Sequence, residues 1–298
     1  MLGQKLVFGF HGKTLPEEFK NLLREYKIGN VILFLRNVES AEQLRALCAE
    51  IQTLVQEETG YPAFIIIDQE GGMVTRLPQD AVNVPGAMSL AATADPENAR
   101  LASEITIRQL RGLGANFNMA PVLDVNSNPA NPVIGVRSFG DEAERVASLG
   151  CAAIAPYAGS GVLCCAKHFP GHGSTGGDTH DGFASSDRTL EELESCDFKP
   201  FEAAIEAGAP MIMVGHMTMT AIDPDNPASL SETIVTGLLR EELGYDGIII
   251  TDALNMGAIS ENYTNADAAV KAVSAGCDML LCVSNISSVV DALTEAVS

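Results

Sequence analysis

Short apolar runs recur along the chain, and longer stretches with a helical pattern of apolar and polar positions separate them. The runs lie at residues 6–10, 31–35, 64–67, 117–122, 162–166, 211–214, 248–250 and 279–283. Most of them are continuously apolar rather than alternating, which is typical of parallel strands that are covered on both faces. The pattern therefore predicts an α/β protein with eight parallel strands.

The stretches between the runs carry helix signals. Helical patterns cover residues 16–26, 40–58, 96–113, 141–158, 200–208 and 264–275, and a last one starts near residue 287. Thr189 and Glu192 have the spacing of a capping box, as do Ser229 and Glu232, so we expect a helix to begin at each pair and Gly244 to end the second. Strand and helix alternate eight times in 298 residues. This count predicts a single (β/α)8 barrel of the TIM type over residues 1–298, with an open doubly wound sheet as the alternative.

Composition and charge narrow the classes of partner. The formal net charge is −21, which argues against a nucleic acid and against an anionic membrane surface. The seven cysteines show no C-x-x-C spacing, so we expect reduced and mostly buried thiols. No apolar run approaches a membrane span, and no signal peptide is visible, so we expect a cytoplasmic protein with a small-molecule partner. The oligomeric state stays open.

Polar side chains gather directly after the predicted strands, where a barrel places its active site. The set comprises His11, Arg36, Asp68, Glu70, Arg76, Asp124, Arg137, His216, Asp252 and Asn285. Each has an ordinary explanation when taken alone: Asp124 suits a turn, Asp252 suits a helix cap, and a lone arginine suits the solvent. Their convergence on one face of the barrel predicts a functional site there.

The richest stretch spans residues 167–181. It holds three of the five histidines together with Lys167, two aspartates and four glycines. We predict a shaped loop, because charged groups would lack water in a buried strand and glycines would lose backbone entropy in a helix. The stretch follows the apolar run 162–166, so Lys167 and His168 are expected at the tip of the fifth strand.

Two chemistries fit these residues poorly. His168, His172, Asp178 and His180 are metal-ligand types, but their spacing is loose and a neighbouring lysine would repel a cation. A Schiff-base aldolase would use Lys167 as a neutral amine, whereas nearby carboxylates would keep that amine charged.

Glycosyl transfer fits better. It needs an anionic nucleophile below the anomeric carbon and a proton donor above the leaving oxygen. Asp252 can act as the nucleophile. His180 can donate the proton, because imidazole titrates near neutral pH. Asp178, two residues before His180, can orient that imidazole as the carboxylate of a catalytic triad does.

The motifs resemble those of family 3 glycoside hydrolases, in the β-N-acetylglucosaminidase (NagZ-like) branch, over essentially the whole chain. The matching segments are Ile67-Asp68-Gln69-Glu70-Gly71-Gly72, Val133-Ile134-Gly135, Arg137-Ser138-Phe139-Gly140, Lys167-His168-Phe169-Pro170-Gly171-His172-Gly173, Asp178-Thr179-His180, Pro227-Ala228-Ser229-Leu230-Ser231 and Gly247-Ile248-Ile249-Ile250-Thr251-Asp252-Ala253-Leu254-Asn255-Met256. The segment that begins at Lys167, followed by Asp-x-His, is highly specific. Met73 departs from the family pattern, because many relatives carry arginine there, and this leaves the details of its loop open.

The resemblance implies a retaining exo-β-N-acetylglucosaminidase that removes terminal β-linked N-acetylglucosamine from muropeptides or chitin-type oligosaccharides. Asp252 is then the nucleophile that forms a glycosyl-aspartate, and His180, paired with Asp178, is the acid/base. The family's sugar-binding positions fall on Asp68, Arg76, Arg137, Lys167 and His168. We expect no metal and no cofactor. The β-glucosidase branch is a poorer match, because it lacks the Asp-x-His loop and takes its acid/base carboxylate from a second domain.

A phosphorylase is the alternative activity. A neutral histidine adds no negative charge above the sugar, so it repels phosphate less than a carboxylate acid/base would. The same residues could then transfer N-acetylglucosamine to phosphate. Water remains the expected acceptor.

Overall fold

The computed structural model describes residues 2–176 and 184–296. Its main sheet is parallel and has the strand order β5-β4-β3-β2-β1-β11-β10-β8-β6. The strands are β1 (Leu6–Phe8), β2 (Asn30–Leu33), β3 (Phe64–Ile67), β4 (Phe117–Asn118), β5 (Leu163–Cys164), β6 (Ala166–Phe169), β8 (Met211–Val214), β10 (Ile248–Ala253) and β11 (Met279–Leu281). A separate pair, β7 (Ser185–Ser186) and β9 (Thr218–Met219), is also parallel.

The two end strands of this order, β5 and β6, are halves of one strand position. Only Cys165 separates them in the chain. The first half pairs with β4 and the second with β8, so the sheet closes on itself through this segment. The predicted eight-stranded barrel is therefore confirmed, and the open doubly wound sheet is wrong.

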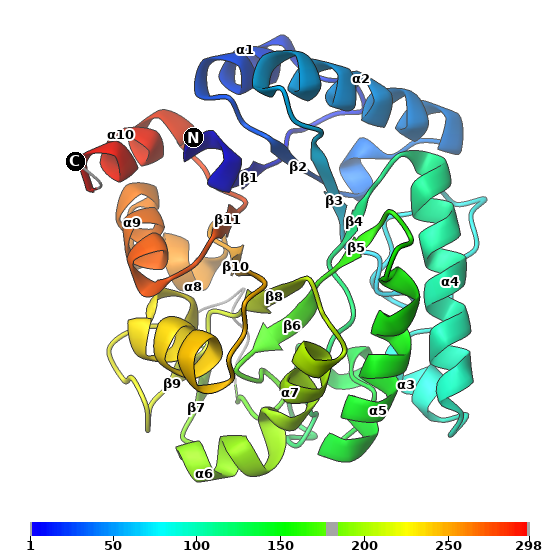
Figure 1. Cartoon of the computed structure of the whole chain (residues 1–298), viewed down its shortest axis with the longest axis vertical. Helices are drawn as coiled ribbons and strands as arrows, with labels where there is room; N and C mark the ends of the chain where they lie inside the picture. The colour runs from blue at the N-terminus through cyan, green and yellow to red at the C-terminus, as the bar shows by residue number, and fades with distance from the viewer. Residues whose placement is uncertain (1, 177–183, 297–298) are drawn as a thin grey trace.

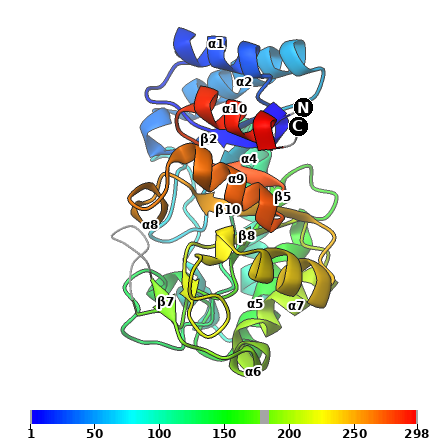
Figure 2. The ribbon, with the colours of Figure 1, turned by 90° about the vertical axis from the view of Figure 1, so that its left-hand side faces the viewer.

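Helices surround the strands. They are α1 (Glu17–Tyr26), α2 (Ala41–Thr59), α3 (Ala87–Ala91), α4 (Pro96–Leu113), α5 (Ala143–Ile154), α6 (Leu190–Glu192), α7 (Lys199–Glu206), α8 (Gly257–Ser260), α9 (Asn265–Ala275) and α10 (Ile286–Ala296). Figure 1 shows the long helices in a ring around the strands. Figure 2 shows α1, α2 and α10 towards one end of the longest axis and α5, α6 and α7 towards the other. None of the helices described is both long and apolar enough to span a membrane.

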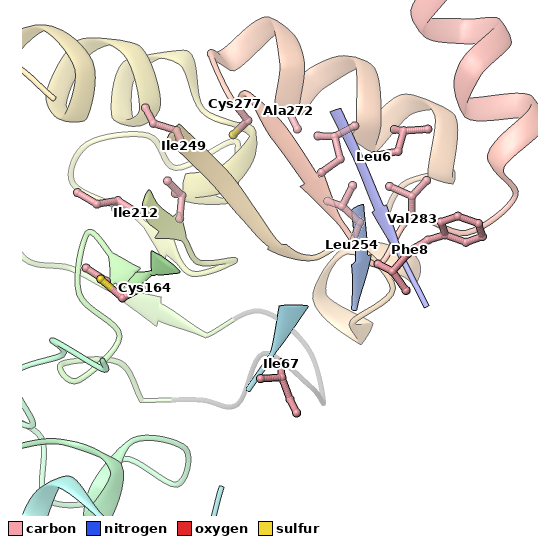
Figure 3. Packing of buried hydrophobic residues seen from close by; sticks show 14 of the residues in the cluster. Leu6, Phe8, Ile67, Cys164, Ile212, Ile249, Leu254, Ala272, Cys277 and Val283 are labelled. Atoms are coloured by element: carbon pink, nitrogen blue, oxygen red, sulfur yellow. The ribbon is translucent and has the colours of Figure 1, made fainter. Parts of the chain in front are cut away.

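The strands bury both of their faces, which explains their continuous apolar character. Alternate positions form an outer layer against the helices, and Figure 3 shows Leu6, Phe8, Ile67, Cys164, Ile212 and Ile249 from this layer. The positions between them fill the barrel, as Val7, Ile32, Ile66, Phe117, Cys165, Met213, Ile250 and Leu281 do. Because side chains alternate along a strand, the same periodicity decides which later residues face into the barrel mouth.

The two predicted capping boxes have different outcomes. Thr189 and Glu192 exchange both bonds of the motif at the start of α6. The box at Ser229 and Glu232 is wrong, because Ser229 is buried in the 3-10 turn Ala228–Leu230 and its hydroxyl contacts His216. Ser231 instead accepts a bond from the Ile234 N–H, close to the π-helix Thr233–Glu242.

Candidate active site

Three charged side chains each come two residues after an apolar side chain that points into the barrel. Asp68 follows β3, Lys167 lies in β6 and Asp252 lies in β10. All three therefore face the mouth of the barrel at the carboxyl ends of the strands, as expected for a barrel active site.

These side chains meet in one cavity of about 520 Å³. Its lining includes Asp68, Arg76, Arg137, Lys167, His168 and Asp252. Every predicted sugar-binding residue thus shares one cavity with the predicted nucleophile. The other two predicted catalytic residues, Asp178 and His180, lie outside the described residues.

Lys167 joins two carboxylates at the centre of the site. Its Nζ lies 2.9 Å from Asp68 Oδ1 and 2.8 Å from Glu70 Oε1. Arg137 holds Glu70 from the other side, with Nη2 2.8 Å from Oε1 and Nε 2.9 Å from Oε2. Burial alone would raise the pKa of Glu70, but Lys167 and Arg137 outweigh burial and lower it. Burial alone would lower the pKa of Lys167, but Asp68 and Glu70 outweigh burial and raise it. Glu70, Lys167 and Arg137 therefore stay charged near neutral pH.

The prediction of a loop over residues 167–181 is wrong at its start, whereas Lys167 and His168 lie at the end of the fifth strand position, as expected. Both lie within β6 and are buried, with Lys167 only 2% exposed. The prediction assumed that burial would leave the charges unpartnered. Two carboxylates from the segment that follows β3 satisfy the lysine instead, and such pairing makes a buried charge tolerable.

Asp124 contacts His168 and His172, an arrangement that the sequence analysis did not predict. It is fully buried, and its Oδ2 lies 2.8 Å from His168 Nδ1. Its Oδ1 accepts a bond from the His172 backbone N–H at 2.6 Å. Burial alone would raise the pKa of Asp124, but His168 and His172 outweigh burial and lower it. Because the carboxylate accepts only, Nδ1 of His168 carries its proton towards Asp124 and leaves Nε2 as the second nitrogen of the ring.

Glu70 belongs to the polar set predicted after the strands, but the sequence analysis gave it no role in the site, and its ion pairs with Lys167 and Arg137 depend on the fold. Not every polar strand end joins the cavity. His11 is exposed to solvent. Asp124 and His216 are fully buried, and neither is among the residues that line the cavity.

Arg76 is placed by the amide of Gln69. Gln69 Oε1 accepts bonds from the Arg76 backbone N–H and from the Thr75 hydroxyl, both at 2.9 Å. Asn118 of β4 in turn bonds the backbone N–H and carbonyl of Gln69 at 2.9 and 3.0 Å. Met73, the departure from the family pattern, is 71% exposed in the same loop.

Asp252 is partly exposed at the cavity, and its Oδ1 accepts a bond from the Ala253 N–H at 2.7 Å. Burial alone would raise the pKa of its carboxyl. The side chains of His216 and His168, the Ala253 N–H and Lys167 outweigh burial and lower that pKa. An ionised carboxylate in a cavity that also holds cations and hydrogen-bond donors can act as a nucleophile towards an electrophilic sugar carbon.

The described residues contain no group of three or more His, Cys, Asp and Glu side chains placed to hold a metal ion. Of the four residues weighed as metal ligands, His168 and His172 are described. His168 Nδ1 contacts Asp124, and His172 Nδ1 contacts the Thr175 hydroxyl at 2.9 Å.

Asp197 yields a prediction about stability and pH. Burial raises the pKa of its carboxyl to about 7, and the ion pair with Arg188 opposes that shift. Because the folded pKa lies above the unfolded value of about 4, the stability from this group is full below pH 4 and is lost as the pH rises through 7. We expect Asp197→Asn to raise Tm by several degrees at pH 8 and to have less effect at pH 5, measured by thermal unfolding. An equal change in Tm at both pH values would contradict this.

Comparison with known proteins agrees with this architecture. The family model described as "Glycosyl hydrolase family 3 N terminal domain" matches residues 4–298. The protein named Beta-hexosaminidase A from Pseudoalteromonas piscicida is 38% identical over 314 residues, which cover 94% of this chain and 52% of that protein. The chain therefore spans about half the length of that relative.

Solved structures show the same barrel. A glycoside hydrolase family 3 β-N-acetylglucosaminidase from Paenibacillus sp. str. FPU-7 is 43% identical with a TM-score of 0.96, over 99% of this chain and 57% of that chain. NagZ from Neisseria gonorrhoeae, solved in complex with N-trifluoroacetyl-D-glucosamine, is 32% identical with a TM-score of 0.85, over 96% of this chain and 83% of that chain.

Proposed function

Because the chain belongs to glycosyl hydrolase family 3, we propose that it is a retaining exo-β-N-acetylglucosaminidase. Its substrates are muropeptides or chitin-type oligosaccharides with a terminal β-linked N-acetylglucosamine. The observation that carries the proposal is the ionised Asp252 carboxylate in one cavity with Lys167, Asp68 and Arg137.

Asp252 attacks the anomeric carbon from below the sugar ring. Its Oδ1 is engaged by the Ala253 N–H, so Oδ2 forms the bond to carbon. His180 donates a proton to the glycosidic oxygen as the bond to the leaving group breaks. Water then attacks the glycosyl-aspartate, gives its proton to His180 and releases the carboxylate. The roles of His180 and its partner Asp178 rest on the family resemblance.

The remaining charged groups bind the sugar. Hydroxyl groups both donate and accept, so a carboxylate beside an ammonium group suits them. Asp68 accepts from a hydroxyl while Lys167 donates to one. His168 presents the ring nitrogen that does not face Asp124. Because the ion pairs hold these groups before substrate arrives, binding needs little rearrangement of the cavity.

The relatives support an N-acetylated sugar. One is named a β-hexosaminidase, one a β-N-acetylglucosaminidase, and NagZ binds an N-acylated glucosamine. We expect this chain to cleave a chromogenic N-acetyl-β-glucosaminide with a kcat/KM about 10² to 10⁴ times that for the corresponding β-glucoside, because a site built around a polar substituent rejects the analogue that lacks it. Equal or better turnover of the β-glucoside would refute the proposal.

The same chromogenic substrate can also test whether the sugar is transferred to water or to phosphate. Digestion in phosphate-free buffer and at saturating phosphate should release N-acetylglucosamine in both cases. Formation of sugar 1-phosphate in the second reaction would instead make the protein a phosphorylase.

A further inference from the structure

His216 is a fully buried imidazole directly behind the nucleophile. It comes two residues after the end of β8. Strand β10, which pairs with β8, carries Asp252. Its Nε2 lies 3.0 Å from the carbonyl oxygen of Ala253, and its Nδ1 lies 2.7 Å from the Ser229 hydroxyl. Both nitrogens are therefore engaged, and His216 itself is not among the residues that line the cavity.

The hydrogen-bond partners of His216 and its burial are compatible with one protonation state of the ring. A carbonyl oxygen only accepts, so Nε2 must carry a hydrogen and donate it to Ala253. Burial lowers the pKa of His216, which keeps the ring neutral near neutral pH. Nδ1 then carries a lone pair, and the Ser229 hydroxyl must donate to it. The carbonyl of Ala253 thereby selects the tautomer of the histidine, and the Ser229 hydroxyl satisfies the lone pair on Nδ1.

The histidine is linked to the nucleophile through a single residue. The carbonyl of Ala253 accepts from His216, and the N–H of Ala253 donates to Asp252 Oδ1 at 2.7 Å. A rotation of the ring would remove one anchor of Ala253 and let its N–H turn away from the carboxylate. This N–H is one of the groups that lower the pKa of Asp252 against the effect of burial, together with His168 and Lys167.

Ser229 is itself held in place. Its N–H donates to the Gly215 carbonyl at 3.1 Å, and the N–H of Ala228 donates to the Met217 carbonyl at 2.8 Å. Main-chain hydrogen bonds therefore join the segment that carries Ser229 to the residues before and after His216.

We propose that Ser229 and His216 are positioning residues for the nucleophile, which they aim at the anomeric carbon by holding Ala253. The inference rests on the proposed function. It also explains the Pro227–Ser231 segment, a motif of the sequence that the sugar-binding and catalytic residues leave unused.

The test compares two serines of this segment. Ser229→Ala removes the donor to Nδ1, and we expect kcat to fall about tenfold to a hundredfold with little change in KM, because a small misplacement of a reacting group has that effect. Ser229→Thr keeps the hydroxyl and should recover most of kcat. Ser231→Ala is the control: Ser231 is also buried, and its hydroxyl bonds the Ile234 N–H and the Asp223 side chain, so its loss should lower Tm and not kcat.

A spectroscopic measurement separates this inference from the proposed function. In protein labelled with ¹⁵N-histidine, the His216 signals should show a neutral ring protonated at Nε2, and Ser229→Ala should shift the Nδ1 signal, because that nitrogen loses its hydrogen-bond donor. That result needs no substrate, so it holds even if the N-acetyl-β-glucosaminide is not cleaved. A wild-type ring protonated at Nδ1, or a kcat for Ser229→Ala no lower than for Ser231→Ala, would overturn the inference.

Discussion

Asp252→Gly is expected to lower kcat by about 10⁴ to 10⁶, which is the loss that follows removal of a catalytic nucleophile. The variant should still fold, because Asp252 is partly exposed at the cavity and its carboxylate has one hydrogen bond in the described structure, to the Ala253 N–H. Turnover of a chromogenic N-acetyl-β-glucosaminide measures the loss, and the melting temperature checks the fold. Asp225→Gly, an exposed aspartate outside the cavity lining, is the control that should keep its activity.

A small anion tests the role of Asp252 more directly. Glycine leaves room below the sugar, so azide can attack the anomeric carbon from the vacated side and restore turnover. The product should be the α-glycosyl azide, because the leaving group departs from the β side. A β-azide, or activity in Asp252→Gly close to that of the wild type, would show that Asp252 is not the nucleophile.

Glu70→Ala is expected to lower the free energy of unfolding by about 3–5 kcal/mol, as the loss of one partner from a buried ion pair does. Its carboxylate lies between Lys167 and Arg137, and its side chain is only 7% exposed. Lys167 retains Asp68, so Arg137 is the charge left without its bidentate partner. Urea unfolding at pH 7 measures the change. Glu144→Gln breaks the exposed pair with Lys199 and serves as the control, with no measurable loss expected.

The pH dependence of this effect follows from the direction of the pKa shift. The folded pKa of Glu70 lies below its usual value, so the stabilisation is present above about pH 5 and is lost as the pH falls below that range. The difference between wild type and Glu70→Ala should therefore narrow towards acid pH. A difference that stays constant down to the acid transition would argue against the ion pair as its origin.

The barrel could be predicted because its determinants are local. Each strand is a short apolar run, and the helix from Pro96 to Leu113 begins and ends where its proline and the following glycine indicate. Burial of both strand faces makes the runs continuous, so they are easy to recognise. The same pattern placed the proposed nucleophile, Asp252, at a strand end, whereas the proposed sugar-binding residues were assigned from the family resemblance.

The errors concern contacts between distant residues. Lys167 pairs with Asp68, 99 positions away, and without that partner a buried lysine is implausible from sequence alone. Asp124 looked like a turn residue because its contact with His168 spans 44 positions. Ser229 matched a capping box, but tertiary contact with His216 placed its hydroxyl elsewhere. Local chemistry thus predicts the elements, and long-range pairing decides how their polar side chains are used.

The alternation of side chains along the strands constrains how this protein can change in length. Asp68, Lys167 and Asp252 face the cavity because each follows an interior residue by two positions. One residue inserted into β10 before Asp252 would turn the carboxylate towards the helices and an apolar side chain towards the sugar. Insertions and deletions compatible with catalysis are therefore restricted to the loops, where they can reshape the surroundings of the sugar without moving the nucleophile to the wrong face.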